Sequence, residues 1–278
     1  MIKSAIQLKA KVRNISKGND KISKAMLRIF FMERFLERVS LSEYKEHFIL
    51  KGGMLVSSLL GISARATMDI DTTIQALPLN KEEIEKIVAE ICDMPLEDNI
   101  SFKIISIETI MDDFDYPGMR LHMEGSLEKL RQPVKIDIST DDAITPGAVE
   151  YKYQLMFEER EISLNTYNIE TLLAEKSQTI INRGLANTRM RDFYDMYEIV
   201  QKKKFSIEVY KKAFWATCTR RKTEFSEDRI RKELDSIATS DDMEMLWDNF
   251  KKKNYFVDDI EYKSIIESVT RTIMKTIE

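Results

Sequence analysis

The chain has 278 residues, a length typical of about two domains. Hydrophobic residues make up 43% of it and charged residues 32%, which excludes a disordered chain. The net charge of −4 excludes a protein that is basic throughout, so any contact with nucleic acid must use a local patch. Two cysteines, Cys92 and Cys218, cannot build a disulfide framework or a thiolate zinc site. The two histidines, His47 and His122, are expected to be structural.

The N-terminal segment 1–19 has scattered lysines and no apolar stretch, which is not the pattern of an export signal. The sequence contains no run of about 18 apolar residues, so it predicts no membrane span. We therefore expect a cytoplasmic protein with no membrane partner, and we expect it to be a monomer.

In chain order, the pattern predicts an α/β half and then a helical half. The first half has expected helices at 20–39, 54–60 and 81–92, and expected strands at 48–50, 66–74, 100–107, 119–124, 133–139 and 151–157. From Asn168, a candidate N-cap, the pattern turns helical, with Gly184 as a stop and further helices at 189–203, 206–218, 226–238, 241–252 and 259–276. The predicted class is α+β: a mixed β-sheet domain over 1–167, followed by an all-helical domain over 168–278.

The most informative segment is the expected strand 66–74. In a strand, alternate side chains share a face, so Asp69 and Asp71 would lie on one face. Their like charges repel, and a divalent cation between them would explain the pair, since Mg²⁺ prefers carboxylate oxygens. Asp137 would join them if the strand 133–139 pairs beside 66–74. The alternative is that these carboxylates are solvated on an exposed strand.

A Gly-Gly pair precedes this strand. Gly52 and Gly53 follow an apolar segment and open a helix, where backbone N–H groups can approach a phosphate. The whole order is Lys51-Gly52-Gly53, then Arg65-Ala66-Thr67-Met68-Asp69-Ile70-Asp71, and later Glu175-Lys176 and Arg191-Asp192-Phe193-Tyr194-Asp195. This series resembles the AbiEii/AbiGii toxin family within the nucleotidyltransferase superfamily, over roughly residues 48–200. One departure is that Met54 and Leu55 follow the glycines where many superfamily members carry a hydroxyl residue, which Ser57 or Ser58 could replace.

The resemblance implies a nucleotidyltransferase-type domain and a metal-dependent toxin of a bacterial toxin–antitoxin or phage-defence pair. It implies Mg²⁺ or Mn²⁺ held by Asp69, Asp71 and Asp137, which with Lys176 and Asp192 form the expected catalytic set. An NTP would contact Lys51, Gly52, Gly53, Arg65, Thr67 and Lys176. The favoured acceptor is the tRNA 3′ end, and a cognate antitoxin would be encoded nearby. The alternatives are a protein hydroxyl or small molecule as acceptor, or a degenerate fold that only binds a nucleotide.

Two features of the helical half are also notable. Lys176 falls inside an apolar stripe, so it either extends its ammonium to solvent or points into a cleft. Asp192 is either a first-turn carboxylate or a group that orients Lys176, and Asp195 is expected on the polar side. The segment 202–222 has a net charge of +7, which is either a solvated surface or an RNA contact. Its candidate RNA-binding residues are Lys203, Lys204, Arg220 and Arg221.

Overall fold

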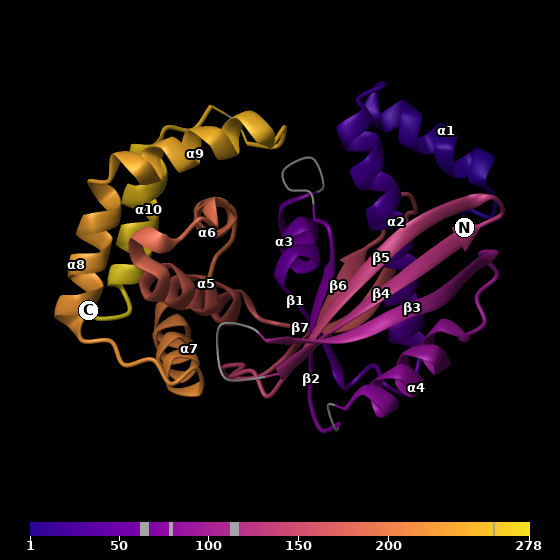
Figure 1. The fold of residues 1–278 in the computed structure, drawn as a ribbon, viewed down its shortest axis with the longest axis horizontal. Coiled ribbons are helices and arrows are strands. Elements are labelled where there is room, and N and C mark those ends of the chain that lie inside the picture. Colours follow the sequence, from indigo (N-terminus) through magenta and orange to yellow (C-terminus); the bar gives the residue numbers. More distant parts are fainter. Residues whose placement is uncertain (62–66, 78–79, 112–116, 258) are drawn as a thin grey trace. The chain divides into compact units, whose positions relative to one another are not determined.

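The computed structural model describes residues 1–61, 67–77, 80–111, 117–257 and 259–278. Within these residues the chain forms one seven-stranded sheet and ten α-helices, which confirms the α+β class (Figure 1). The chain divides into two compact units. The first unit comprises 1–58, 66–141 and 149–166, and the second comprises 59–65, 142–148 and 167–278.

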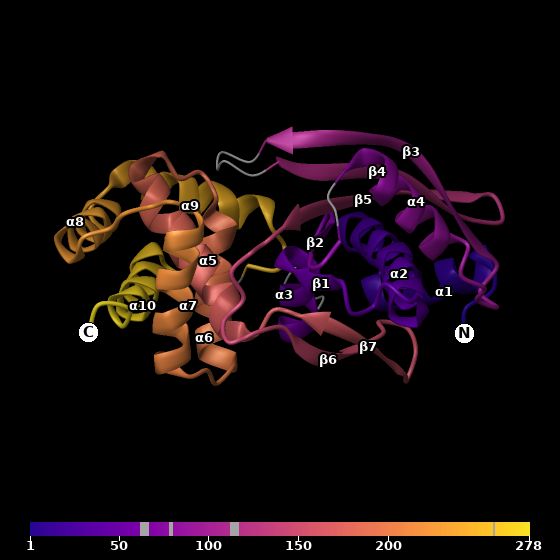
Figure 2. The same cartoon turned by 90° about the horizontal axis from the view of Figure 1, so that it is seen from below.

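The sheet belongs to the first unit and has the order β3-β4-β5-β2-β1-β7-β6, with β3 and β6 at its two edges (Figure 2). Its strands are β1 (Phe48–Lys51), β2 (Ile70–Ile74), β3 (Ile100–Met111), β4 (Pro117–Leu127), β5 (Leu130–Thr140), β6 (Val149–Gln154) and β7 (Glu161–Thr166). The pairs β1–β7 and β2–β5 are parallel, and the other pairs are antiparallel. The strand β2 therefore lies at the centre, with β1 on one side and β5 on the other.

The helices of the first unit cover this sheet. They are α1 (Ala5–Ser16), α2 (Asp20–Leu41), α3 (Gly52–Leu60), whose last two residues the second unit includes, and α4 (Lys81–Cys92). The helix α2 begins at Asn19, whose side chain accepts from the N–H groups of the first turn, and it packs on β5 and β7. It buries Phe30, Phe31 and Phe35, each at most 1% exposed, and these rings form the centre of the core.

Two elements were not predicted, and one was predicted too long. The helix α1 is not among the predicted elements, because lysines and other polar residues separate its few buried apolar side chains, Ala5, Leu8 and Val12. The short strand β7, which lies next to the edge strand β6, is also not among the predicted elements. It follows closely on β6 in the sequence and has few strongly apolar residues. The strand β2 begins at Ile70, so the prediction of a strand from 66 is wrong for the described residues that precede it. Residue 66 lies outside the described residues.

The second unit is helical, and its helices match the predicted ones to within a few residues. They are α5 (Ile169–Arg183), α6 (Met190–Lys202), α7 (Ile207–Arg220), α8 (Glu227–Ala238), α9 (Asp241–Lys253) and α10 (Tyr262–Met274). Asn168 caps α5 by accepting from Thr171 N at 2.7 Å, and Gly184 ends it, as predicted. Tyr210, Phe214 and Trp247 are fully buried and form the core. No helix among the described residues has the length and apolarity needed to cross a bilayer.

Candidate active site

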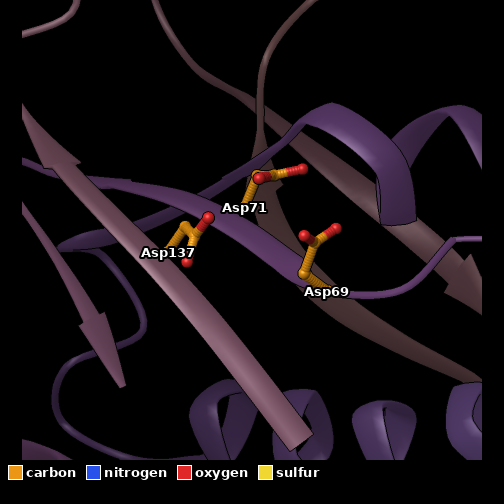
Figure 3. Close-up of side chains that lie close together, drawn as sticks. All are labelled: Asp69, Asp71 and Asp137. Atoms are coloured by element: carbon orange, nitrogen blue, oxygen red, sulfur yellow. The ribbon is translucent and has the colours of Figure 1, made fainter. Parts of the chain in front are cut away.

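Three carboxylates of the first unit converge beside the centre of the sheet (Figure 3). The parallel pair β2–β5 places Asp71 directly opposite Asp137, so the expected pairing of these two segments is confirmed. Asp69 comes just before β2, and one oxygen from each carboxylate lies within 4.8 Å of the other two. We call Asp69, Asp71 and Asp137 the carboxylate cluster.

The Gly-Gly pair seats one member of this cluster. Gly52 has φ +56°, a left-handed conformation that glycine adopts without strain. A Cβ atom at this position would lie 2.1 Å from Asp71 Oδ2, so only glycine leaves room for the carboxylate. Gly53 N donates a hydrogen bond to the same oxygen at 2.9 Å. The glycines thus hold a carboxylate in place, a role that the sequence alone did not suggest.

The electrostatics of the cluster disfavour three negative charges. Burial raises the pKa of Asp71, and the nearby charge of Asp69 raises it further. The hydrogen bond from Gly53 and the positive charge of Lys51 oppose this shift of the Asp71 pKa. A cation placed among the oxygens would relieve the repulsion.

Two basic side chains from the neighbouring strands already contact the cluster. Arg120 on β4 donates from Nε and Nη2 to the two oxygens of Asp137, both at 2.8 Å. Lys135 on β5 places its Nζ 2.6 Å from Asp69 Oδ2 and 3.7 Å from Asp137 Oδ2. Sequence reasoning assigned no role to either residue. The role of Arg120 can be recognised only from the register of β4 and β5, because this register pairs Arg120 with Asp137.

The donor set fits a hard divalent cation. Mg²⁺ and Mn²⁺ prefer oxygen ligands, and the cluster supplies three carboxylates that are partly exposed, with Asp69 at 24% and Asp137 at 18%. Each carboxylate oxygen has two lone-pair directions, so the Arg120 bonds leave one direction on each Asp137 oxygen. Asp69, Asp71 and Asp137 are therefore the residues that would hold such a cation.

Two of the other residues predicted to bind the nucleotide come from the segments that surround this cluster, and Lys176 belongs to the second unit. Lys51 ends β1 opposite Asp71, next to Gly52. Thr67 is 1% exposed, and its hydroxyl donates to the backbone oxygen of Asp69 at 3.3 Å. Arg65 lies outside the described residues.

The two serines considered as replacements for the missing hydroxyl residue differ in their surroundings. Ser57 is 1% exposed, within α3. Ser58 Oγ lies 3.0 Å from the hydroxyl of Tyr151 on β6. Neither environment by itself assigns a role in nucleotide binding.

Lys176 forms a second charged cluster, which belongs to the second unit. Its Nζ donates to Asp192 Oδ1 and to Asp195 Oδ2, both at 2.8 Å, and the side chain is 9% exposed. The alternative that Lys176 extends into solvent is therefore wrong. The expectation that Asp195 lies on the polar side is also wrong, since Asp195 is fully buried. Its burial is possible because the ammonium of Lys176 compensates its charge.

The four candidate RNA-binding residues of the segment 202–222 lie at the two ends of α7. Lys203 and Lys204 precede α7, whereas Arg220 and Arg221 end it, and its 14 residues separate the two ends by about 20 Å. Arg221 is engaged within the unit, donating to Gln178 Oε1 at 2.7 Å and to Glu175 Oε1 at 3.1 Å. The aromatic residues between the two ends are mostly core, as expected, with Tyr210 and Phe214 fully buried.

The mixed sheet, the Gly-Gly helix start and the paired strands that carry carboxylates together define a nucleotidyltransferase-type protein. Two solved structures from Helicobacter pylori have the same fold. One is JHP933, with a TM-score of 0.52, 14% identity and 91% of each chain covered. The other is a candidate nucleotidyltransferase, with a TM-score of 0.53, 14% identity, and 91% of this chain and 94% of that chain covered. No curated protein sequence matches the chain significantly.

The family model described as "Nucleotidyl transferase AbiEii toxin, Type IV TA system" matches residues 34–268. The chain therefore belongs to the AbiEii family of nucleotidyltransferase toxins. The match confirms the resemblance drawn from the motifs and extends it well beyond residues 48–200. It also includes most of the C-terminal helices, which carried no motif that sequence reasoning could use.

Proposed function

We propose that the protein transfers a nucleoside monophosphate from an NTP to an acceptor hydroxyl, with the tRNA 3′ end as the acceptor. The observation that carries this proposal is the convergence of Asp69, Asp71 and Asp137 beside the Gly52–Gly53 turn. The acceptor oxygen forms a bond to the α-phosphorus, and the bond from that phosphorus to the oxygen of the β-phosphate breaks. Pyrophosphate leaves, and the proton of the acceptor hydroxyl passes to solvent.

Asp69, Asp71 and Asp137 would hold Mg²⁺ or Mn²⁺, which when bound would neutralise charge on the triphosphate and lower the pKa of the acceptor hydroxyl. Gly52 and Gly53 keep Asp71 in a fixed position through the close approach and the hydrogen bond. Arg120 holds both Asp137 oxygens, which suits Asp137 to be a ligand rather than an acceptor of protons. Lys51, beside the glycines, is placed to contact a phosphate of the NTP.

Lys176 and Asp192 are proposed to act on the nucleotide from the second unit. The support for this role is the family likeness and the geometry of the pair, since Asp192 and Asp195 fix the ammonium of Lys176. Membership of a type IV toxin–antitoxin family supports a cognate antitoxin as partner. The antitoxin would limit the damage that the transfer causes.

The test uses each of the four NTPs labelled at the α-phosphate, incubated with the protein and with total RNA or total protein. Label in tRNA supports the proposal, whereas label in protein alone overturns the choice of acceptor. No label in either pool overturns the transfer itself. NTP labelled at the γ-phosphate is the matched control, and it must leave no label because that phosphate departs with pyrophosphate.

A further inference from the structure

The N-terminal helices are strongly basic in an otherwise acidic protein. Residues 1–28 contain eight Lys or Arg and one Asp, a net charge of +7 in a chain of net −4. The family match begins only at residue 34, so these residues lie outside it. The helix α1 buries one face, with Ala5, Leu8 and Val12, and it packs on α2 (Figure 1). Its remaining faces are available to solvent.

Two of the basic residues of α1, Lys9 and Arg13, fall on one flank of the helix. Lys9 and Arg13 are four residues apart, and Lys17, the C-cap, follows after four more. At 3.6 residues per turn Lys9 and Arg13 share one flank of the helix, and Lys17, whose backbone is left-handed, follows directly after the C-terminus of α1. Lys11 lies on another flank, where its Nζ donates to the backbone oxygen of Phe157 at 2.9 Å.

A second row of basic residues lies on α2, and it ends next to the segment that carries Asp69. Lys21, Lys24 and Arg28 follow at spacings of three and four, which again places them on one face over about 10 Å. Arg28 Nη1 contacts Met68 Sδ, and Met68 directly precedes Asp69. The row of positive charges on α2 therefore ends at a contact with the residue that precedes Asp69, within the same unit. We call Lys9, Arg13, Lys17, Lys21, Lys24 and Arg28 the basic ridge.

The charges of the ridge are not used for internal ion pairs. Lys9, Arg13, Lys17, Lys21 and Lys24 are exposed, and none of them pairs with a carboxylate among the described residues. Lys3, by contrast, lies 3.1 Å from Glu97. Five exposed cations on two adjoining helices with no internal partner form a surface that suits a polyanion.

We propose that the basic ridge binds the phosphate backbone of the acceptor RNA and guides its end toward the carboxylate cluster. This proposal rests on the proposed function, because it names the surface that holds the acceptor. RNA is the favoured partner because an RNA phosphate backbone that is bound along α2 would extend toward the carboxylate cluster, where the transfer is proposed to take place. A membrane surface is disfavoured because the exposed apolar residues of α1, Ile6 and Ile15, are nine positions apart and point to opposite sides of the helix.

The test measures the affinity of the full-length protein for fluorescently labelled, deacylated tRNA across a KCl series. The ridge variant is Lys17→Gln/Lys21→Gln/Lys24→Gln. The matched control is Lys81→Gln/Lys86→Gln/Lys129→Gln, which removes the same charge from exposed lysines of the same unit. Each phosphate contact contributes about −0.7 to −0.9 to the slope of log affinity against log salt. The ridge variant should therefore flatten the slope by about two, and the control should keep the wild-type slope.

A ridge variant with the wild-type slope would overturn the proposal. So would a control that loses as much slope as the ridge variant, or a loss of slope only when Lys203, Lys204 and Lys212 are changed to Gln. Binding to anionic phospholipid vesicles is measured in parallel. If the ridge variant loses vesicle binding while its tRNA affinity is unchanged, the surface belongs to a membrane contact and the proposal is wrong.

The test of the basic ridge and the test of the proposed transfer can fail independently of each other. If the wild type labels no RNA but the ridge variant loses tRNA affinity, the ridge stands and the transfer to tRNA fails. If the wild type labels tRNA and the ridge variant has the wild-type KM for tRNA, the transfer stands and the ridge fails. Support for both requires a raised KM for tRNA in the ridge variant and an unchanged KM in the control.

Discussion

The two units each contain a cluster of charged side chains, and the clusters differ in their access to solvent. In the first unit, Asp69 and Asp137 are 24% and 18% exposed, and their cations Lys135 and Arg120 are 29% and 31% exposed. In the second unit, Lys176 is 9% exposed and Asp195 is fully buried. Both clusters contain a cation between carboxylates, so the residue types alone do not distinguish a ligand-binding cluster from a structural one.

The difference lies in whether the internal cation can be exchanged. The ammonium of Lys135 lies at the rim of the carboxylate cluster and can be replaced by a cation from solvent at modest cost. The ammonium of Lys176 is buried between Asp192 and Asp195, so its removal would take a shared counter-charge from two buried carboxylates, of which Asp192 also pairs with Arg189 at 2.8 Å. The carboxylate cluster therefore suits a site that binds a cation from solvent. The cluster around Lys176 suits an ammonium group whose position is already fixed in the folded protein.

The largest expected effect is the loss of transfer in Asp71→Asn. The substitution removes a charged ligand from the centre of the cluster, so the rate of label transfer should fall by at least about 10³-fold. The Gly53 N–H can still donate to the amide oxygen of asparagine, and a repulsion is relieved. The melting temperature without metal should therefore be equal to or above that of the wild type. Near-full transfer, or a large drop in melting temperature, would contradict the assignment.

For the second cluster the expected effect is on folding. Lys176→Met should lower the free energy of unfolding by about 3–5 kcal/mol, because the buried Asp192 and Asp195 lose the ammonium that lies between them. Chemical denaturation measures this change. The triple variant Lys176→Met/Asp192→Asn/Asp195→Asn should recover much of the loss. If Lys176→Met alone unfolds with the wild-type midpoint, the cluster is not the closed charge pair described here.

Gly52→Ala should disturb the first cluster without removing a carboxylate. The new Cβ would collide with Asp71 Oδ2, and the left-handed backbone would be strained by about 1–3 kcal/mol. We expect transfer to fall by roughly 10²-fold through displacement of Asp71. Gly18→Ala is the matched control, since Gly18 has φ +82° with no atom within 4 Å of its added Cβ. Equal transfer by the two variants would show that the close approach at Gly52 is unimportant.

The last expected effect is a pH dependence of stability and concerns Glu33, a buried carboxylate on α2 that forms no ion pair with a cation among the described residues. Burial raises the pKa of Glu33 to about 8, against the hydrogen bond from Met156 N and the charge of Arg34. A raised pKa means that the folded state holds the proton of Glu33 more tightly than the unfolded state does. The resulting contribution of Glu33 to the free energy of unfolding is therefore complete below pH 4.5 and is lost as the pH rises toward 8. The decline is at most about 1.4 kcal/mol per pH unit.

Glu33→Gln should remove this pH dependence, because glutamine does not titrate. Denaturation midpoints of the wild type and the variant, measured from pH 4.5 to 8.5, provide the check. The two proteins should converge at low pH and separate at high pH, with the variant the more stable. A separation that grows toward low pH would reverse the sign and contradict the burial argument.

Much of this arrangement was accessible from the sequence, and the remainder depends on tertiary contacts. The alternation around Asp71 and Asp137 predicted their convergence because strand periodicity fixes which side chains share a face. The partner of Asp137 could not be predicted, since Arg120 reaches it only through the register of a long hairpin. The burial of Asp195 was missed for a similar reason, because its compensating cation, Lys176, is on another helix.

The most direct test of the carboxylate cluster is a titration of the wild type with Mn²⁺, followed by electron paramagnetic resonance. The titration is made in the presence of an NTP whose α–β bridging oxygen is replaced by methylene. The account predicts saturable binding to the wild type, and at least about tenfold weaker binding in Asp69→Asn, Asp71→Asn and Asp137→Asn alike. Lys81→Gln serves as the control and should bind as the wild type does. Unchanged Mn²⁺ affinity in any one of the three aspartate variants would contradict a single shared site.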